Sequence, residues 1–144
     1  MTPPKSASGA VTALQGALAA EHAAVYGYGV AGALLSGAAR AAAQDDWTAH
    51  QVARDSLERM LTGLGATPVA ASPAYRLPFT VTSAKSAARL AAYLEDGVTR
   101  GYLGVVAVSD PGLRAFGARS MQTAAGRAAG WSGTTQAFPG LPKS

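Results

Sequence analysis

Two glutamates stand in the middle of otherwise apolar helical stripes, and they are the residues of this chain best placed to do chemistry. Glu21 lies in a run whose apolar residues recur every three or four positions from Leu14 to Leu35, and Glu95 lies in a similar run that ends at Val106. This period places each carboxylate on the buried face of a helix. A buried carboxylate has to pair with a cation, bind a metal ion or exchange protons.

The candidate partners of these carboxylates are cationic. His50 and Arg54 lie one turn apart on a third stripe that is otherwise apolar, so we expect both to face the core, with Arg127 beside them from the last helix. A guanidinium in the core supplies the positive charge that a metal ion would supply, and it repels any cation beside it. We therefore predict a buried polar network in which charge-assisted hydrogen bonds join Glu21 and Glu95 to these cations.

Two tyrosines share the faces of the glutamates. Tyr28 follows Glu21, and Tyr102 follows Glu95, by two helical turns. Their hydroxyls either join the network or reach an edge of the core while the rings fill space.

Two further interpretations of the same residues stay open. One is a mononuclear or incomplete metal site, for iron or manganese, that uses Glu21, His50 and Glu95. The other is a pocket for a small molecule or an anion around Arg54 and His50. No serine, histidine and aspartate arrangement for nucleophilic catalysis can be recognised, and the chain is expected to be non-catalytic.

Composition narrows the class of protein. With 144 residues and no cysteine, the chain is one domain that needs no disulfides, and a thiolate zinc site is excluded. The net charge of +4 comes with scattered arginines rather than a basic block, so it does not favour nucleic acid, although a basic module for an acidic partner remains an alternative. No apolar run follows the N-terminus, and we expect a cytoplasmic protein with no membrane span.

Four helices are expected to position these side chains, over residues 9–39, 45–64, 83–108 and 111–131. A break at residues 41–44 is expected before the second, with Asp45 or Asp46 as its cap. Residues 1–8 should form a flexible arm, residues 9–131 the bundle and residues 132–144 an extended tail. The three links between these helices differ in length. Residues 65–82 contain three prolines and are long enough to cross the whole bundle, whereas the other two links are short.

These link lengths decide the topology. Short links make helices one and two antiparallel, and likewise three and four, while the long link lets helix three start at the same end as helix two. The expected fold class is therefore all-α, a ferritin-like four-helix bundle with a long crossover between helices 2 and 3. Helix one is apolar on its outer face too, from Ala23 to Leu34, which predicts a homodimer through helix 1.

Several stretches also resemble a known family. They read ALQGALAAEHAAVYGYGVAGALL, HQVARDSLERML, GATPVAASPAYRLPF and ARLAAYLEDGV. Together they resemble an uncharacterised bacterial ferritin-like domain family, over about residues 10 to 131. Within the wider ferritin-like superfamily, that resemblance implies oxygen chemistry or iron storage at a dinuclear metal site.

The ligand set of such a site is incomplete in this chain. The superfamily takes one glutamate from each of two helices and a Glu-x-x-His pair from each of the other two. Glu21 and Glu95 match glutamate positions, but neither histidine follows a glutamate at that spacing, and the fourth helix has no acid after Asp110. We predict a bundle of unknown function without a complete dinuclear site or cofactor; the alternative is a metal-dependent oxidoreductase with a reduced ligand set.

Overall fold

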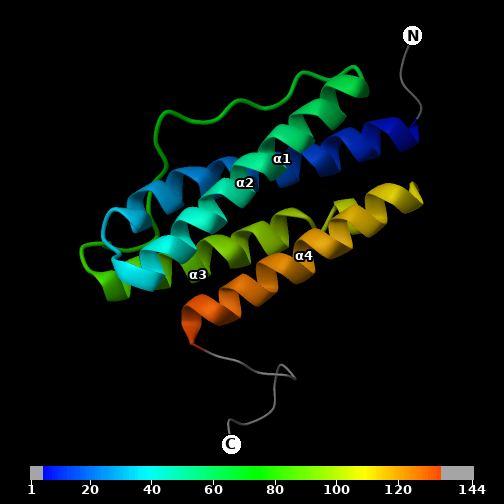
Figure 1. The fold of residues 1–144 in the computed structure, drawn as a ribbon. Helices are drawn as coiled ribbons and strands as arrows, with labels where there is room; N and C mark the ends of the chain where they lie inside the picture. Colours follow the sequence, from blue (N-terminus) through cyan, green and yellow to red (C-terminus); the bar gives the residue numbers. More distant parts are fainter. Residues whose placement is uncertain (1–4, 134–144) are drawn as a thin grey trace, which may run out of the picture.

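Four α-helices form a bundle in the computed structural model, which describes residues 5–133. They are α1 (Lys5–Gly32), α2 (Gly37–Gly63), α3 (Ala84–Gly101) and α4 (Pro111–Ser132), with a short 3₁₀ helix, η1 (Val105–Ala107), before α4. Within the described residues there is no strand. Neighbours joined by short links run antiparallel, and α2 and α3 start at the same end of the bundle (Figure 1). The all-α, one-crossover ferritin-like fold is thus confirmed.

The long connection between α2 and α3 runs back along the bundle beside α1 (Figure 1). The side-chain amide of Gln15 holds this connection with two hydrogen bonds of 2.8 Å: its Nε2 donates to Thr67 O, and its Oε1 accepts from Val69 N. His22 Nε2 lies 2.9 Å from Val69 O. The rings of Tyr26 and Tyr75 pack with their centroids 5.4 Å apart. The crossover therefore covers part of the outer face of α1 that the sequence assigned to a second subunit.

The first break in the chain lies earlier than the sequence pattern predicted. α1 ends at Gly32, and Ser36, with extended backbone, precedes α2. Gly37 has a φ of +56°, which a residue with a Cβ adopts only with strain. The predicted break at residues 41–44 was wrong, because the alanine-rich run continues the helix there. Asp45 and Asp46, either of which was expected to cap α2, both lie inside it.

The starts of α3 and α4 are fixed by local caps. At α3, the hydroxyl of Ser83 accepts a hydrogen bond from the backbone N–H of Ser86, and the hydroxyl of Ser86 accepts one from the backbone N–H of Ser83. At α4, the carboxylate of Asp110 accepts a hydrogen bond from Leu113 N. α3 ends at Gly101 rather than continuing to residue 108, and η1 follows it. α1 begins at Lys5, inside the predicted arm. Of the predicted tail, residues 134–144 lie outside the described part of the chain.

The helices do not pack evenly around the bundle. α1 packs against both α2 and α3, and α3 packs against α4, but α2 and α4 share no comparable interface among the described residues. The core consists of leucine, alanine and valine with the two buried tyrosines, Tyr28 and Tyr102. No described helix is both long and apolar enough to span a membrane.

Candidate functional site

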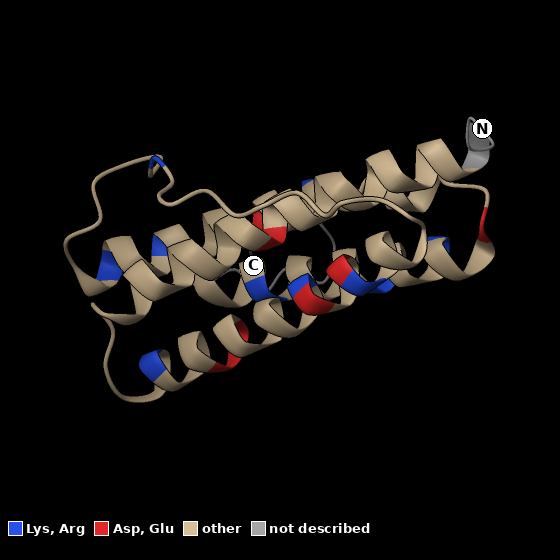
Figure 2. Ribbon diagram, turned by 90° about the horizontal axis from the view of Figure 1, so that it is seen from above, with Lys and Arg blue, Asp and Glu red and all other residues tan. Residues whose placement is uncertain are grey.

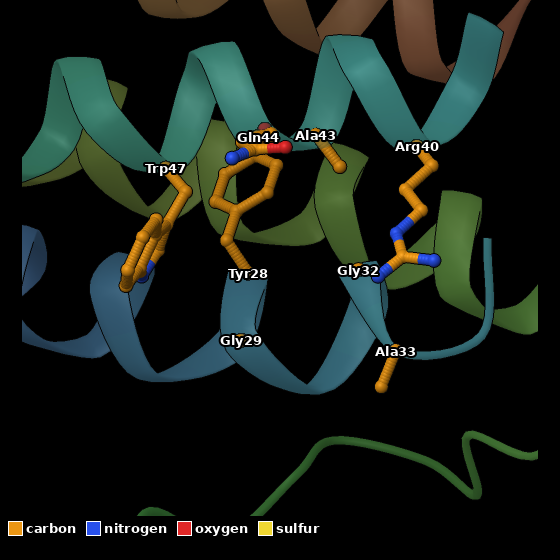
Figure 3. Close-up of a pocket in the computed structure, with 8 residues that line it drawn as sticks. All are labelled: Tyr28, Gly29, Gly32, Ala33, Arg40, Ala43, Gln44 and Trp47. Carbon is orange, nitrogen blue, oxygen red and sulfur yellow. The ribbon is translucent and has the colours of Figure 1, made fainter. Parts of the chain in front are cut away.

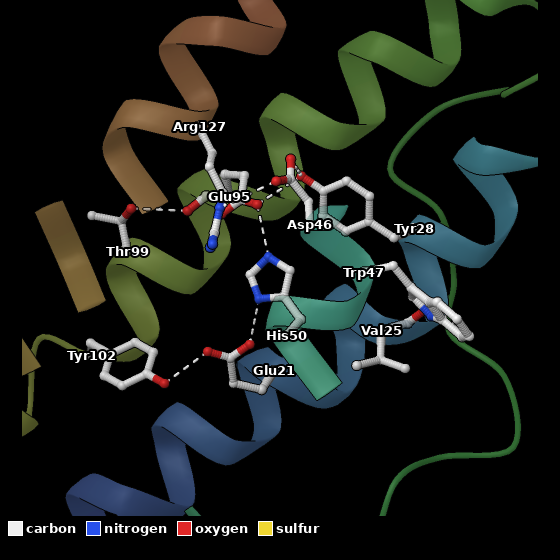
Figure 4. A network of polar contacts seen from close by, with 10 residues as sticks. All are labelled: Glu21, Val25, Tyr28, Asp46, Trp47, His50, Glu95, Thr99, Tyr102 and Arg127. Atoms are coloured by element: carbon white, nitrogen blue, oxygen red, sulfur yellow. Dashed lines mark hydrogen bonds and ion pairs between the residues drawn. The ribbon is translucent and has the colours of Figure 1, made fainter. Parts of the chain in front are cut away.

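The centre of the bundle holds an imidazole between two carboxylates (Figure 4). His50 comes from the middle of α2, Glu21 from α1 and Glu95 from α3. His50 Nδ1 lies 2.6 Å from Glu21 Oε2, and His50 Nε2 lies 2.7 Å from Glu95 Oε1. All three residues are buried, with at most 2% of their surface exposed. The buried network of Glu21, Glu95 and His50 predicted from the sequence is therefore present.

These distances favour the charged form of the ring. Both nitrogens face carboxylate oxygens, so a ring that satisfies both contacts donates from both and is an imidazolium. Burial lowers the pKa of His50, but the hydrogen bonds and negative charges of Glu21 and Glu95 outweigh it and raise that pKa from 6.5 to about 9. His50 thus carries a positive charge at neutral pH.

Both tyrosines extend the network. The hydroxyl of Tyr102 donates to Glu21 Oε1 at 2.8 Å, and that of Tyr28 donates to Glu95 Oε1 at 2.7 Å. Burial, and then the nearby negative charges, raise the pKa of each tyrosine above its ordinary value. The two phenols therefore stay protonated and act as hydrogen-bond donors to the carboxylates.

A third carboxylate, Asp46, connects the network to α4. Its Oδ2 lies 3.2 Å from the Tyr28 hydroxyl and accepts a hydrogen bond from Trp131 Nε1 at 2.8 Å. Its Oδ1 lies 3.3 Å from Nε of Arg127. Arg127 therefore joins the network through Asp46, not through a glutamate. The sequence reasoning missed Asp46; its place one turn before His50 was the available signal once α2 is known to begin at Gly37.

Arg54 does not take part, which corrects the sequence interpretation. Its Nε bonds Oδ1 of its neighbour Asp55 at 2.9 Å, and the two side chains are 28% and 49% exposed. Each step of four residues turns a helix by about 40°, so Arg54 lies further round α2 than His50. Its long side chain then carries the charge out to solvent.

The geometry of this centre does not fit a metal ion. Glu21 and Glu95 bind opposite nitrogens of His50, so they cannot share one ion with that ring. The only buried side-chain oxygen or nitrogen without a partner in the described residues is Glu95 Oε2. A single free donor atom is too few for iron or manganese, which need several ligands. Among residues 5–133, no group of three histidine or acidic side chains is arranged to hold a metal.

Two cavities border the network. One of about 340 Å³ lies between the end of α1 and the start of α2, where Arg40 and Trp47 stand over Gly29 and Gly32, and it reaches only Tyr28 (Figure 3). The other, of about 370 Å³, lies between α2 and α4. Glu21, His50 and Tyr102 contribute to its wall, and Arg119 and Arg127 line it from α4.

Comparison with solved structures supports the fold. The crystal structure of a conserved hypothetical protein from Mycobacterium tuberculosis is 34% identical, with a TM-score of 0.83, over 87% of this chain and 96% of that one. A structure of ferritin-like, diiron-carboxylate proteins from Bacillus anthracis str. Ames is 15% identical, with a TM-score of 0.74, over 90% of this chain and 97% of that one. At 15% identity, the second match shows similarity of fold and nothing more.

Comparison with protein families identifies the family of this chain but assigns it no activity. No curated protein matches the chain. Residues 13–143 match the model of a family described as Domain of unknown function (DUF4439). The uncharacterised ferritin-like family predicted from the sequence is thus confirmed, and the chain belongs to this domain family of unknown function.

Proposed function

We propose that this domain is a ferritin-like bundle that works without a dinuclear metal centre, as a non-catalytic domain whose polar core holds the helices in register. One observation supports this most strongly: both nitrogens of His50 are engaged by carboxylates, Glu21 at 2.6 Å and Glu95 at 2.7 Å. An imidazolium in that position does electrostatically what a metal cation does in a carboxylate-lined bundle, since it neutralises buried negative charge.

The contacts explain how such a network orients the helices. Its hydrogen bonds join α2 to α1 and α3 through His50, and Asp46 adds α4 through Trp131. Each contact is directional, so a shift of one helix by a turn would leave a carboxylate buried and unpaired. Breaking such a buried charge pair costs about 3 to 5 kcal/mol. The network therefore selects one register among several that apolar packing alone would allow.

Metal analysis tests the proposal. The full chain, purified without chelators from cells supplied with iron and manganese, is expected to carry far less than one ion per chain. Glu21→Gln, chosen because it keeps the shape of the side chain, should carry the same trace amount, with its fold checked by circular dichroism. One or two ions per wild-type chain that are lost in Glu21→Gln would establish the alternative, a metal-dependent oxidoreductase with a reduced ligand set.

The basic-module alternative gains little from the charge distribution. Lysines and arginines are spread along the helices and the crossover, with acidic residues among them (Figure 2). An electrostatic footprint for nucleic acid needs a basic stripe on one face. We therefore do not assign nucleic acid as a partner.

Two expectations from the sequence are kept as proposals. The first is a cytoplasmic location. The second is a homodimer through helix 1, now restricted to the C-terminal end of α1 and the turn that follows it, where Gly29, Ala33 and Leu34 face solvent. Leu34 is 37% exposed, and an exposed large apolar side chain beside small residues suits a close contact between subunits.

A further inference from the structure

The side of the bundle between α2 and α4 is built differently from the other three. These helices share no extensive interface, and the cavity of about 370 Å³ lies between them. The α2 wall is made of small residues, Ala49 and Ala53, whereas the α4 wall carries Arg119, Thr123 and Arg127. A helix face turned toward a neighbouring helix is ordinarily apolar. This face of α4 is polar and cationic: Arg127 pairs with Asp46 of α2, whereas Arg119 and Thr123 line the cavity.

The three cations around the cavity are balanced by three carboxylates, but one of the cations, Arg119, has no direct partner within residues 5–133. Arg127 is paired with Asp46 at 3.3 Å, and His50 lies between Glu21 and Glu95. The guanidinium of Arg119, at the exposed edge, has no hydrogen bond or ion pair within residues 5–133. One guanidinium without a direct partner can pair with one negative charge, and its planar fork suits a carboxylate.

The remaining lining favours an apolar body on that anion. The hydroxyls of Ser120 and Thr123 already donate to backbone oxygens one turn back, each at 2.9 Å, so they add no free donor. Phe116 and the two alanines Ala49 and Ala53 supply an apolar surface. A cavity of this size is within the range of small-molecule sites, and its lining combines this apolar surface with charged groups, Glu21 and His50 on the inner wall and arginines on α4.

We propose that the cleft between α2 and α4 binds a small organic monoanion, a carboxylate on an aromatic or aliphatic body, with the carboxylate on Arg119 and the body against Phe116 and Ala53. This goes beyond the proposed function, because the polar network supplies only the inner wall of the cleft. A metal-free core and an occupied cleft are independent properties, so failure of either leaves the other standing.

The charge requirement can be tested with three probes. We would titrate 4-phenylbutyrate into the ¹⁵N-labelled full chain and follow the amide resonances of Arg119 and Thr123, which should shift saturably. The neutral 4-phenylbutanol should bind about tenfold more weakly or worse, the loss expected for one charge-assisted hydrogen bond. Absence of saturable shifts, equal binding of the alcohol, or tighter binding of the dianionic phenyl phosphate would each overturn the assignment.

Matched variants locate the site. Arg119→Gln should weaken 4-phenylbutyrate about tenfold, while Arg59→Gln, on an exposed part of α2 outside the cleft, should leave the affinity unchanged. Ala53→Leu should fill the cleft and abolish binding, whereas Val52→Leu, next to it but 59% exposed, should not. Equal affinities within either pair would contradict the proposal, and circular dichroism would show that each variant is folded.

Discussion

His50 makes the stability of the core depend on pH. Its pKa is about 9 in the folded chain and near 6.5 when exposed, so the folded state binds the proton more tightly. Its stabilising effect is complete below pH 6.5 and is lost as pH rises toward 9. A shift of this size corresponds to about 3 kcal/mol in the free energy of unfolding. Tyr28 and Tyr102, with raised pKa values, stay neutral over this range.

Urea unfolding between pH 6 and 9.5 checks this prediction. The free energy of unfolding should be steady at the acid end and fall across the window. His22→Gln is the matched control, because the ring of His22 bonds the crossover carbonyl of Val69 and lies outside the Glu21–His50–Glu95 network, and this variant should keep the pH dependence. His50→Gln should be less stable at pH 7 and should lose the slope. A slope that persists in His50→Gln would assign the effect to another group.

Arg54 provides a contrasting prediction at the same scale. Because it pairs with the half-exposed Asp55, Arg54→Ala should lower the free energy of unfolding by less than about 1 kcal/mol. A buried partner of Glu21 and Glu95 would instead cost about 3 to 5 kcal/mol on removal. Chemical denaturation at pH 7 separates the two values. A loss of free energy of unfolding in the higher range would show that Arg54 is a buried member of the network.

Among the elements, α1 and α3 approach closely at Gly101. A Cβ added there would lie 2.5 Å from Cβ of Ala20, which has no flexible end to move aside. Gly101→Ala should therefore destabilise the bundle by about 1 to 3 kcal/mol. Gly97→Ala is the control on the same helix, since its added Cβ would meet nothing nearer than 3.9 Å. It should be neutral or stabilise by up to about 1 kcal/mol through helix propensity.

Thermal unfolding of the two glycine variants decides the point. The melting temperature of Gly101→Ala should fall below that of the wild type, and that of Gly97→Ala should not. If both variants melt alike, α1 and α3 are not as close at this position as described.

Helix boundaries explain which parts of the site were predictable. Periodicity alone placed Glu21, Glu95 and His50 on inward faces, because a helical stripe needs no knowledge of where the helix starts. It failed for Asp46, because an aspartate near a presumed helix start was read as a cap. Alanine-rich sequence continues α2 through residues 41–44, so only Ser36 and Gly37 marked the true start.

Over the whole molecule, the crossover was predictable in length but not in what it covers. Three prolines and the absence of a helical period identified it, yet its contacts with Gln15 and His22 depend on long-range packing that no local pattern records. The apolar outer face of α1 was consequently assigned entirely to a second subunit, although the chain covers part of it with its own residues.

The remaining exposed end of α1 makes the oligomeric state testable. Light scattering at micromolar concentration should give twice the 14.4 kDa mass of one chain. Leu34→Glu should return it to the mass of one chain, because a charge at the contact would be buried unpaired. Val52→Glu, an exposed apolar position on α2, should remain dimeric. A wild-type mass of 14.4 kDa would end the dimer proposal.

The central claim is that His50 is an imidazolium bridging Glu21 and Glu95, and nitrogen NMR of the ring tests it most directly. With ¹⁵N-labelled histidine in the full chain at pH 7, both ring nitrogens of His50 should be protonated, and they should remain unchanged when Fe(II) or Mn(II) is added. A ring with one bare nitrogen at pH 7, or resonances that vanish or shift on addition of one equivalent of metal, would contradict the account.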